Sequence, residues 1–361
     1  MIYKSEAEYD LYLNTDTNLL NRCQWFYFSV SNTQKNIKVT FNIKNLTKYP
    51  HFIKEGMRPL AFSLTNKEWI GKTTNIKIQR TDSIQIKGER IIELNDLQEN
   101  ISTSNKRVYY TLSFSYTFKD NDHVYFAPWR PYSYTDLTTF LKQCEIKLSK
   151  SSTKFIESSL STTIETNSLH YKRERLCYSL GGIPIYLITV TGVENKAKTY
   201  VVITARVHSS ETAGSYKAEG ILKCLLGNTV VANELRKEYI FLIAPMVNPD
   251  GVVLGNTRFS LGGWDLNRCW GNPIPTLQPS IYFIKEYIRK LNIGFYFDLH
   301  GHSKALNSFI FACYRDISQS PSSWAKTHLF PRIFADKCQI ISLEQCQFNS
   351  EHDKVIWDIL G

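Results

Sequence analysis

Several features that would place a protein in another class are missing from this sequence of 361 residues. Its eight cysteines include no Cys-x-x-Cys pair, so a zinc finger built from thiolates is not expected. The first residues lack the apolar stretch of a signal peptide, and no apolar run elsewhere approaches membrane-spanning length. We therefore expect a cytoplasmic protein with free cysteines in a reducing compartment and with no membrane partner.

Basic residues are in excess, but they do not form blocks. The sequence has 43 Lys and Arg against 33 Asp and Glu, for a net charge of +10. Such an excess favours an acidic partner, whereas the scattered distribution argues against a nucleic-acid-binding arm. An ordinary solvated surface is the alternative that the charge alone leaves open.

The order of patterns along the chain predicts two domains. Residues 1–147 contain segments in which apolar residues alternate with period two, which predicts an antiparallel β-sandwich. Residues 148–168 are rich in Ser and Thr, and we expect a surface connection there. From 169 to 361, strand-like segments alternate with helical ones, which predicts an α/β domain with a mostly parallel mixed sheet.

The individual elements follow from the same patterns. In the first domain we expect strands at 24–30, 37–43 and 109–118 and a helix over 133–144. In the second domain we expect strands at 183–191, 199–207, 239–247 and 293–299, a turn at 248–251, and helices over 213–226 and 278–291.

Two of these strands are followed by histidines. The β-branched run 199–207 leads into His208 and, three residues on, Glu211, and the run 293–299 leads into His300. The carboxyl ends of strands in an α/β sheet share one edge, where ligands bind. Two imidazoles and one carboxylate leave a fourth coordination position open, which is typical of a catalytic zinc site. We therefore predict one Zn²⁺ per chain, held by these three side chains.

Other polar residues lie near these positions in the sequence. Asn267 beside Arg268 suits the binding of a carboxylate. Arg258 precedes them, and from the residues alone a place on a solvated face is an equally good interpretation. His302 is either a hydrogen-bonded histidine of the site or an alternative metal ligand. We favour His300 as the ligand because it directly ends the apolar run.

Together these segments resemble the zinc carboxypeptidases, specifically the branch of the cytosolic carboxypeptidases. The segments that carry the resemblance in the second domain are Thr204 to Thr212, Asn248 to Val252, Asp265 to Trp270 and Asp298 to Ser303. In the first domain, Asp16 to Asn18, Gln24 to Phe28, Gly56 to Leu60 and Tyr125 to Ala127 resemble the β-sandwich domain of that branch. The resemblance covers almost the whole chain.

The resemblance implies a role for each site residue. His208, Glu211 and His300 match the zinc ligands of the family. Arg258 matches the arginine that polarises the scissile carbonyl and stabilises the oxyanion. Asn267 and Arg268 match the pair that binds the terminal carboxylate of the substrate, and we place His302 with these substrate-binding residues.

The resemblance also implies the substrate. The branch removes glutamates from the C-terminal tails of proteins or from side-chain polyglutamate branches, chiefly on tubulin. We therefore expect a zinc metallocarboxypeptidase that acts on acidic protein tails in the cytoplasm, in association with microtubules or cilia.

The chain departs from the family pattern in three places. Ser209 and Ser210 replace the more usual Pro-Gly, and Trp129 stands in a segment that we expect at the domain interface. Family members place a general-base glutamate shortly after a Trp-x-x-x-Gly segment, but this sequence stops at Gly361.

The missing glutamate leaves three interpretations of the function. We expect a fragment of a peptidase, with a C-terminally incomplete α/β domain. The alternative is a non-catalytic, zinc-containing module that binds acidic tails. A peptidase or amidase related to the aspartoacylase-like group is a third interpretation, against which the N-terminal β-sandwich segments argue.

Overall fold

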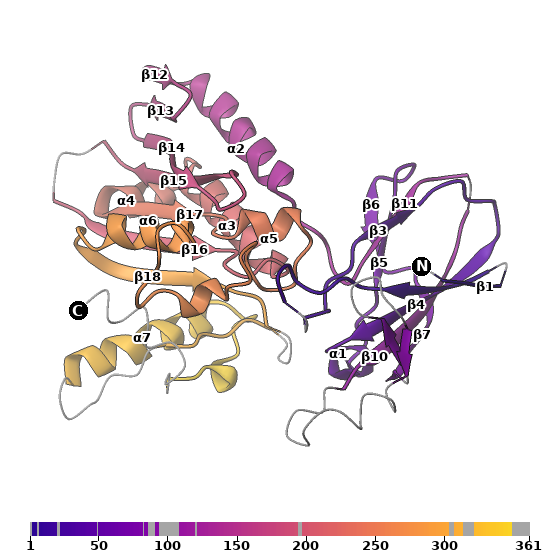
Figure 1. Ribbon diagram of the computed structural model, residues 1–361. Coiled ribbons are helices and arrows are strands. Elements are labelled where there is room, and N and C mark those ends of the chain that lie inside the picture. Colours follow the sequence, from indigo (N-terminus) through magenta and orange to yellow (C-terminus); the bar gives the residue numbers. More distant parts are fainter. Residues whose placement is uncertain are drawn as a thin grey trace.

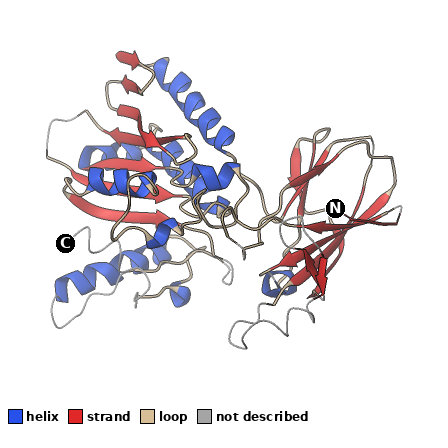
Figure 2. Ribbon diagram, in the orientation of Figure 1, coloured by secondary structure: helices blue, strands red, loops and turns tan. Residues whose placement is uncertain are grey.

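Two bodies of secondary structure lie side by side in the computed structural model (Figure 1). The structure describes residues 2–5, 7–19, 22–48, 50–81, 83–85, 91–93, 108–119, 121–193, 197–302, 307–312 and 321–348. We call the body that extends to Ala127 the β-domain and the body that starts at Tyr134 the α/β domain. Figure 2 shows that the β-domain consists almost entirely of strands, whereas helices flank the sheet of the α/β domain.

The β-domain contains two main sheets, of five and four strands. The first has the order β1 (Ile2–Ser5), β2 (Glu8–Tyr12), β4 (Lys38–Leu46), β10 (Tyr110–Thr117) and β7 (Thr74–Arg80). The second has the order β3 (Phe28–Val30), β11 (Val124–Ala127), β5 (Leu60–Ser63) and β6 (Glu68–Ile70). A short helix, α1 (Pro50–Lys54), and a hairpin of β8 (Ser83–Gln85) and β9 (Ile91–Glu93) complete the described part. All pairs are antiparallel except β2 with β4, which is parallel.

Aromatic side chains hold the two sheets together. Phe41 and Phe114 from the first sheet and Phe126 from the second are all buried. The ring centroid of Phe126 lies 5.2 Å from that of Phe41 and 5.8 Å from that of Phe114. The period-two alternation of these strands places such rings on one face, and burying that face against the other sheet is the main stabilising contribution.

The α/β domain is built on a sheet of seven strands. Their order is β12 (Lys154–Glu157), β13 (Ser161–Glu165), β14 (His170–Tyr178), β15 (Pro184–Thr191), β17 (Tyr239–Ala244), β16 (Thr199–Ala205) and β18 (Ile293–Leu299). Only β17 with β16 and β16 with β18 pair in parallel, and the other four pairs are antiparallel. The sheet is therefore mixed and mostly antiparallel, so our prediction of a mostly parallel sheet is wrong. Parallel neighbours need a long crossover, and the connections within β12–β15 are too short to provide one.

The Ser- and Thr-rich segment 148–168 is part of this sheet rather than only a surface connection, because it supplies β12 and β13. The residues of β13 alternate between partly exposed and buried, and Thr162 and Ile164 point inward. Because threonine takes an apolar position here, the period-two pattern is hidden in the sequence. β12 lies at the sheet edge with all its residues exposed, including the apolar Phe155 and Ile156.

Helices cover both faces of the seven-stranded sheet. Packing against one face are α2 (Tyr134–Ser149), α3 (Thr212–Leu225) and α4 (Val230–Glu238), and α6 (Pro279–Ile288) packs against the other. The remaining described helical segments are α5 (Pro249–Val253), η1 (Leu266–Arg268), α7 (Pro321–Lys337) and η2 (Leu343–Gln345). None of the helices in the described part is long and apolar enough to cross a membrane.

The ends of the predicted helices follow local signals. Ser133 caps α2 through a capping box with Asp136, and the helix continues five residues beyond Cys144, to Ser149. The predicted turn at 248–251 begins the short helix α5, which is capped by Asn248.

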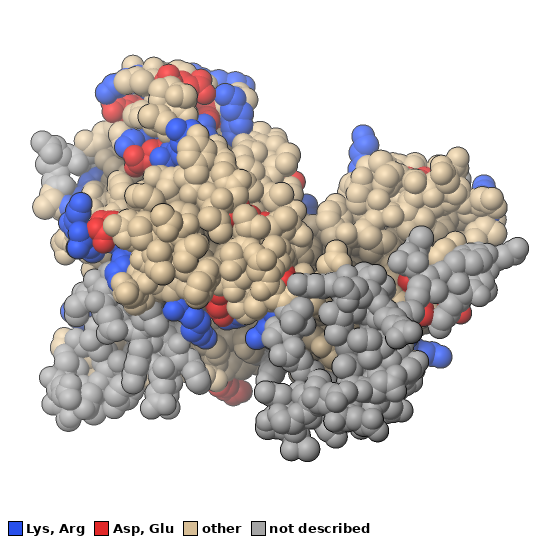
Figure 3. Space-filling model, viewed as in Figure 1, with Lys and Arg blue, Asp and Glu red and all other residues tan. Residues whose placement is uncertain are grey.

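Charged side chains are as scattered on the described surface as they are along the sequence. On the face shown in Figure 3, basic and acidic side chains are interspersed over α2, β12 and β13, and the described atoms of that face form no large basic patch. The seven cysteines among the described residues are all free.

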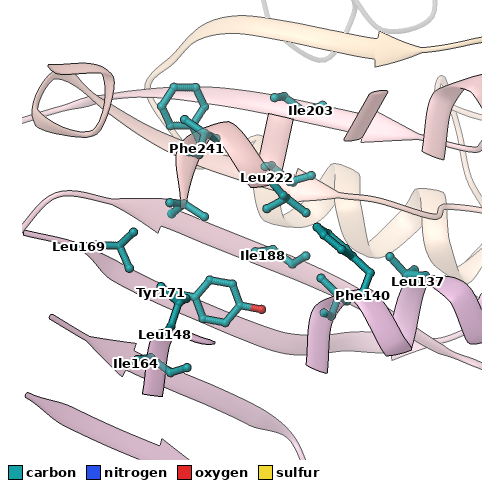
Figure 4. Close-up of a cluster of buried hydrophobic side chains, with 14 of the residues drawn as sticks. Leu137, Phe140, Leu148, Ile164, Leu169, Tyr171, Ile188, Ile203, Leu222 and Phe241 are labelled. Atoms are coloured by element: carbon teal, nitrogen blue, oxygen red, sulfur yellow. The ribbon is translucent and has the colours of Figure 1, made fainter. Parts of the chain in front are cut away.

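The largest core of the α/β domain lies between the sheet and the first group of helices (Figure 4). In it, Leu137 and Phe140 from α2 and Leu222 from α3 face the sheet. Along β16, Ile203 packs into this core, whereas Val202 packs into the core beneath α6. The strand is thus buried on both faces, which explains its uninterrupted apolar sequence and fixes the position of its carboxyl end.

Candidate active site

The carboxyl ends of β16 and β18 lie side by side and carry the two predicted histidines. In the parallel register, Thr204 is opposite Asp298 and Ala205 is opposite Leu299. His300 follows β18 directly, whereas β16 ends at Ala205, two residues earlier than predicted. The strand stops because Arg206 has a φ of 59°, in the left-handed region that only a few residues occupy at low cost. This turn brings the chain to His208.

The structure brings His208, Glu211 and His300 together as one group of potential metal ligands. Nδ1 of His208 lies 2.8 Å from Oε1 of Glu211, and Nδ1 of His300 lies 2.9 Å from Oε2 of the same carboxylate. The donor atoms of the three side chains all lie within 4.8 Å of one another. Two imidazole nitrogens and a carboxylate at this spacing fit a single zinc ion.

Two aspartate carboxylates, one for each ring, orient the imidazole rings of His208 and His300. Nε2 of His208 lies 3.1 Å from Oδ1 of Asp265, and Nε2 of His300 lies 2.7 Å from Oδ2 of Asp298. An N–H donated from Nε2 leaves the lone pair of Nδ1 free for a metal, which is the common arrangement around histidine ligands. We assigned no role to these two aspartates from the sequence, although both stand in the segments that carry the family resemblance.

Asp298 is itself held by neighbouring strands. Oγ1 of Thr204 donates to Oδ1 of Asp298 at 2.9 Å and also lies 2.9 Å from the hydroxyl of Tyr296. Tyr296, Thr204, Asp298 and His300 thus form a chain in which each side chain contacts the next. Such a network restricts the orientation of the His300 ring before any metal binds.

The surroundings shift the pKa values of the site residues. Burial alone would raise the pKa of Glu211, but hydrogen bonds with His208 and His300 and the charges of both rings outweigh it and lower this pKa strongly. Burial likewise opposes a lower pKa for Asp265, whereas His208 and Arg258 together depress it well below its usual range. Both carboxylates are therefore ionised at neutral pH, as metal binding requires.

Arg258 lies beside the potential ligands. Its Nε donates to Oδ2 of Asp265 at 2.8 Å, and its Nη1 lies 3.4 Å from Nδ1 of His208. Asp265 therefore contacts a metal-ligand candidate with one oxygen and a cation with the other. The guanidinium group is therefore held beside the potential metal ligands.

The predicted carboxylate-binding residues lie at the same edge. The Nδ2 atom of Asn267 lies 3.5 Å from Nε2 of His300. Arg268 is exposed, and its Nη1 donates to the carbonyl of Asn267 at 3.1 Å. His302 is also exposed, and it packs edge-on against Phe309 with ring centroids 5.0 Å apart. His302 is not part of the group whose ligand atoms converge.

Arg206 is a further site residue that the sequence did not single out. It is buried, and its Nε donates to the carbonyl of Ser209 at 2.7 Å. Its Nη1 donates to the carbonyl of Tyr132 at 3.0 Å and to Oγ of Ser215 at 2.9 Å. Burial lowers the pKa of Arg206 to about 10, and the charge of Glu211 counteracts part of that effect. One guanidinium group thus joins the turn before Glu211, the start of α3 and the segment between the domains.

The expected interface residue Trp129 also contacts this turn. Its Nε1 donates to the carbonyl of Ser210 at 3.0 Å, and its ring lies 5.5 Å from that of Trp25 between centroids. Ser210, one of the two serines that replace the more usual Pro-Gly, is therefore held by a side chain that packs against the core of the β-domain.

Comparisons with known proteins identify relatives of the chain. The chain is 35% identical over 327 residues to cytosolic carboxypeptidase 4 of Homo sapiens, a match of 85% of this chain and 27% of the relative. It is 32% identical over 394 residues to cytosolic carboxypeptidase 1 of Xenopus laevis, covering 98% of this chain and 30% of the relative. The chain thus spans less than a third of the length of these two relatives.

Solved structures show the same fold. A metallo-carboxypeptidase from Burkholderia cenocepacia matches with a TM-score of 0.68 and 21% identity, covering 96% of this chain and 78% of the other. A metallo-carboxypeptidase from Pseudomonas aeruginosa, in complex with (2-guanidinoethylmercapto)succinic acid, matches with a TM-score of 0.69 and 17% identity, covering 98% and 81%. The profile of the zinc carboxypeptidase family matches residues 156–357. The resemblance inferred from the sequence is confirmed: the chain belongs to the zinc carboxypeptidase family.

Proposed function

We propose that this chain forms the metal- and substrate-binding part of a zinc carboxypeptidase that removes glutamates from acidic protein tails. The observation that carries the proposal is the convergence of Nδ1 of His208 and Nδ1 of His300 on the carboxylate of Glu211, with Arg258 beside them. When bound there, zinc would supply Lewis-acid polarisation of a substrate carbonyl and would lower the pKa of a water molecule.

The other residues would bind and orient the substrate. The Arg268 guanidinium would hold a terminal carboxylate, together with the amide of Asn267. Arg258, kept in place by Asp265, would donate to the carbonyl oxygen as negative charge develops on it. Asp265 and Asp298 would keep the two imidazoles in the tautomer that a metal needs.

The substrate class is proposed from charge and from the relatives. The net charge of +10 favours acidic partners, and the curated relatives are named cytosolic carboxypeptidases. We propose that the substrate is a polyglutamate tail or branch, that tubulin is the principal target, and that the protein acts in the cytosol near microtubules or cilia.

Glutamate release tests this function. Zinc-loaded protein is incubated with a peptide that ends in several glutamates, and free glutamate is measured for this chain and for any longer form that its gene encodes. We expect release that stops when zinc is removed. Stoichiometric zinc with neither release nor peptide binding by any form would contradict the proposal. Binding without release would support the alternative, a module that grips acidic tails without cutting them.

A matched pair of arginine variants tests the carboxylate-binding role. Arg268→Ala should weaken binding of the polyglutamate peptide about tenfold or more, because a charge-assisted contact is lost. Arg289→Ala is the control, since Arg289 is an exposed arginine that pairs with Glu286 away from the site. Equal affinities for the two variants would show that Arg268 does not bind the terminal carboxylate.

A further inference from the structure

A carboxylate from the β-domain lies inside the loop that carries Arg258. Asp16 belongs to the segment between β2 and β3, and only 2% of its surface is exposed. Its Oδ1 accepts a hydrogen bond from the N–H of Thr257 at 2.6 Å, although the two residues are 241 positions apart. Its Oδ2 accepts from the N–H groups of Arg258 at 2.8 Å and Phe259 at 2.9 Å. Three successive backbone donors thus converge on one side chain.

Neighbours of Asp16 in the same segment hold the rest of this loop, residues 256–261. The acceptors in the loop are a side-chain amide oxygen, a hydroxyl and a backbone carbonyl. The bonds run from N and Oγ1 of Thr17 to Oδ1 of Asn256 (3.1 and 3.0 Å), from N of Gln24 and of Trp25 to Oγ1 of Thr257 (3.1 and 3.2 Å), and from Nδ2 of Asn18 to the carbonyl of Leu261 (2.8 Å).

These bonds restrict the conformation of the loop, together with a bond from within the α/β domain in which the N–H of Ser210 donates to the carbonyl of Thr257 at 2.9 Å. Residues 256–261 belong to no helix or strand, so their backbone groups have no regular partners. A buried N–H without a partner costs roughly 1–3 kcal/mol in proteins, so three such groups strongly favour the conformation that reaches a carboxylate. Bonds from N–H groups to a charged acceptor are also stronger than those to a neutral one.

Arg258 is consequently held at both ends. Asp16 binds its backbone N–H, and Asp265 binds its guanidinium group, which lies beside His208. A shift of the loop backbone would move the guanidinium away from the potential metal ligands, because within the described part of the chain its hydrogen bonds are the one to Asp265 and the longer one to His208. The position of this group in the site therefore depends on a residue of the other domain.

We propose that Asp16 is a positioning residue for Arg258, through which the β-domain completes the active site of the α/β domain. The inference rests on the role proposed above for Arg258. A purely structural role, in which Asp16 only docks the two domains, is the alternative that the experiments must separate.

The first experiment observes Arg258 directly and does not depend on activity. The variant is Asp16→Asn, in which an NH₂ group replaces one of the two acceptor oxygens. The control is Asp10→Asn, because Asp10 is a similarly buried carboxylate that accepts from Asn42 inside the β-domain. The signal is the Nε–H resonance of Arg258 in zinc-loaded protein, assigned by its loss in Arg258→Lys.

We expect Asp16→Asn to shift or broaden this resonance and Asp10→Asn to leave it unchanged. Zinc content should stay stoichiometric in both variants, since neither residue contacts a ligand candidate. An unshifted resonance in folded Asp16→Asn would overturn the proposal. A similar shift in both variants would also overturn it, because the effect would then be a general loss of structure.

The second experiment measures whether Asp16 acts through Arg258. The probe is a phosphinic peptide that ends in glutamate, which mimics the tetrahedral adduct of a cleaved peptide bond. Asp16→Asn should weaken its binding to the zinc-loaded protein about tenfold or more. In an Arg258→Ala background, Asp16→Asn should weaken binding of the phosphinic peptide by less than about twofold, because both substitutions act through the same contact of Arg258 with the peptide. Additive losses would overturn the proposal and indicate a structural role.

A second variant tests the role of Asp16 if the first one does not fold. If Asp16→Asn does not fold, Thr257→Val removes the acceptor for Gln24 and Trp25 and should shift the Arg258 resonance in the same way but less strongly. An unchanged resonance in that variant would count against the proposal. If the unaltered protein does not bind the probe, the proposed function has failed, and the resonance alone then decides the role of Asp16.

Discussion

The Nε2 atom of His208 lies 3.1 Å from a carboxylate oxygen of Asp265. The other oxygen of Asp265 accepts a hydrogen bond from Nε of Arg258 at 2.8 Å. One side chain thus controls both the tautomer of a metal-ligand candidate and the place of the cation beside it.

The substitution Asp265→Asn should therefore weaken zinc binding. An amide cannot accept the Nε2 proton of His208 and the guanidinium bond of Arg258 with equal strength, and outer partners of this kind typically contribute 10–100-fold to metal affinity. The affinity is measured by competition with a chelator. Asp250→Asn is the control, because Asp250 is also buried but accepts from the N–H of Gly181 away from the ligands. Equal zinc affinities for the two variants would contradict the prediction.

The two nearby histidines should behave differently when each is replaced by alanine. His300→Ala removes one of the three converging donors, and we expect the protein to lose its zinc on dialysis. His302→Ala should keep stoichiometric zinc, because His302 is exposed and packs against Phe309 outside the converging group. Metal analysis of the dialysed proteins checks both results. Zinc loss in His302→Ala would make His302 a ligand.

Gly214 allows α3 to approach the end of β18. A Cβ atom at this position would lie 2.4 Å from the carbonyl oxygen of Leu299, next to His300. Since α3 begins directly after Glu211, Gly214→Ala should push two ligand candidates apart, weaken zinc binding and destabilise the fold by about 1–3 kcal/mol. Urea unfolding and a zinc titration measure these effects.

Gly220 provides the matched control in the same helix. A Cβ atom at Gly220 would meet no other atom within 4 Å. Gly220→Ala should therefore stabilise the protein by up to about 1 kcal/mol, since alanine loses less backbone entropy in a helix. If both alanine variants had the same stability, close packing at Gly214 would not be the cause.

Asp122 should make the stability of the protein depend on pH in the acid range. Burial would raise the pKa of this carboxyl, but bonds from the Ser63 hydroxyl and from the N–H groups of His123 and Thr65 lower it further than burial raises it. A carboxyl with a lowered pKa in the folded state contributes stability above its unfolded pKa of about 3.9 and loses it as the pH falls through the folded value.

Comparison of the protein with Asp122→Asn measures this contribution. The difference between their urea midpoints should be largest near pH 7 and should shrink as the pH falls below about 4, because the unfolded chain takes up a proton on this carboxyl before the native state does. A difference that stays constant from pH 7 to pH 3 would show that the charge of Asp122 makes no contribution.

Much of the candidate site could be predicted from the sequence because it depends on short-range order. His208 and His300 follow apolar runs that indicate strands, and the carboxyl ends of neighbouring parallel strands lie together, although β18 is an edge strand without a buried residue. The spacing of Glu211 from His208 keeps it within the same turn. The sheet as a whole was harder to predict. The period-two pattern of β13 includes a buried threonine, and short connections between strands made most strand pairs antiparallel.

Donor chemistry and strand periodicity are local properties of the chain, so the residues that can bind a metal could be predicted from the sequence. The groups that orient those residues became visible in the folded protein. Asp16 reaches Arg258, and Asp265 reaches His208, across 242 and 57 positions of sequence. Contacts of that range depend on how the two domains and the ends of separate strands pack, and no spacing along the chain encodes such packing.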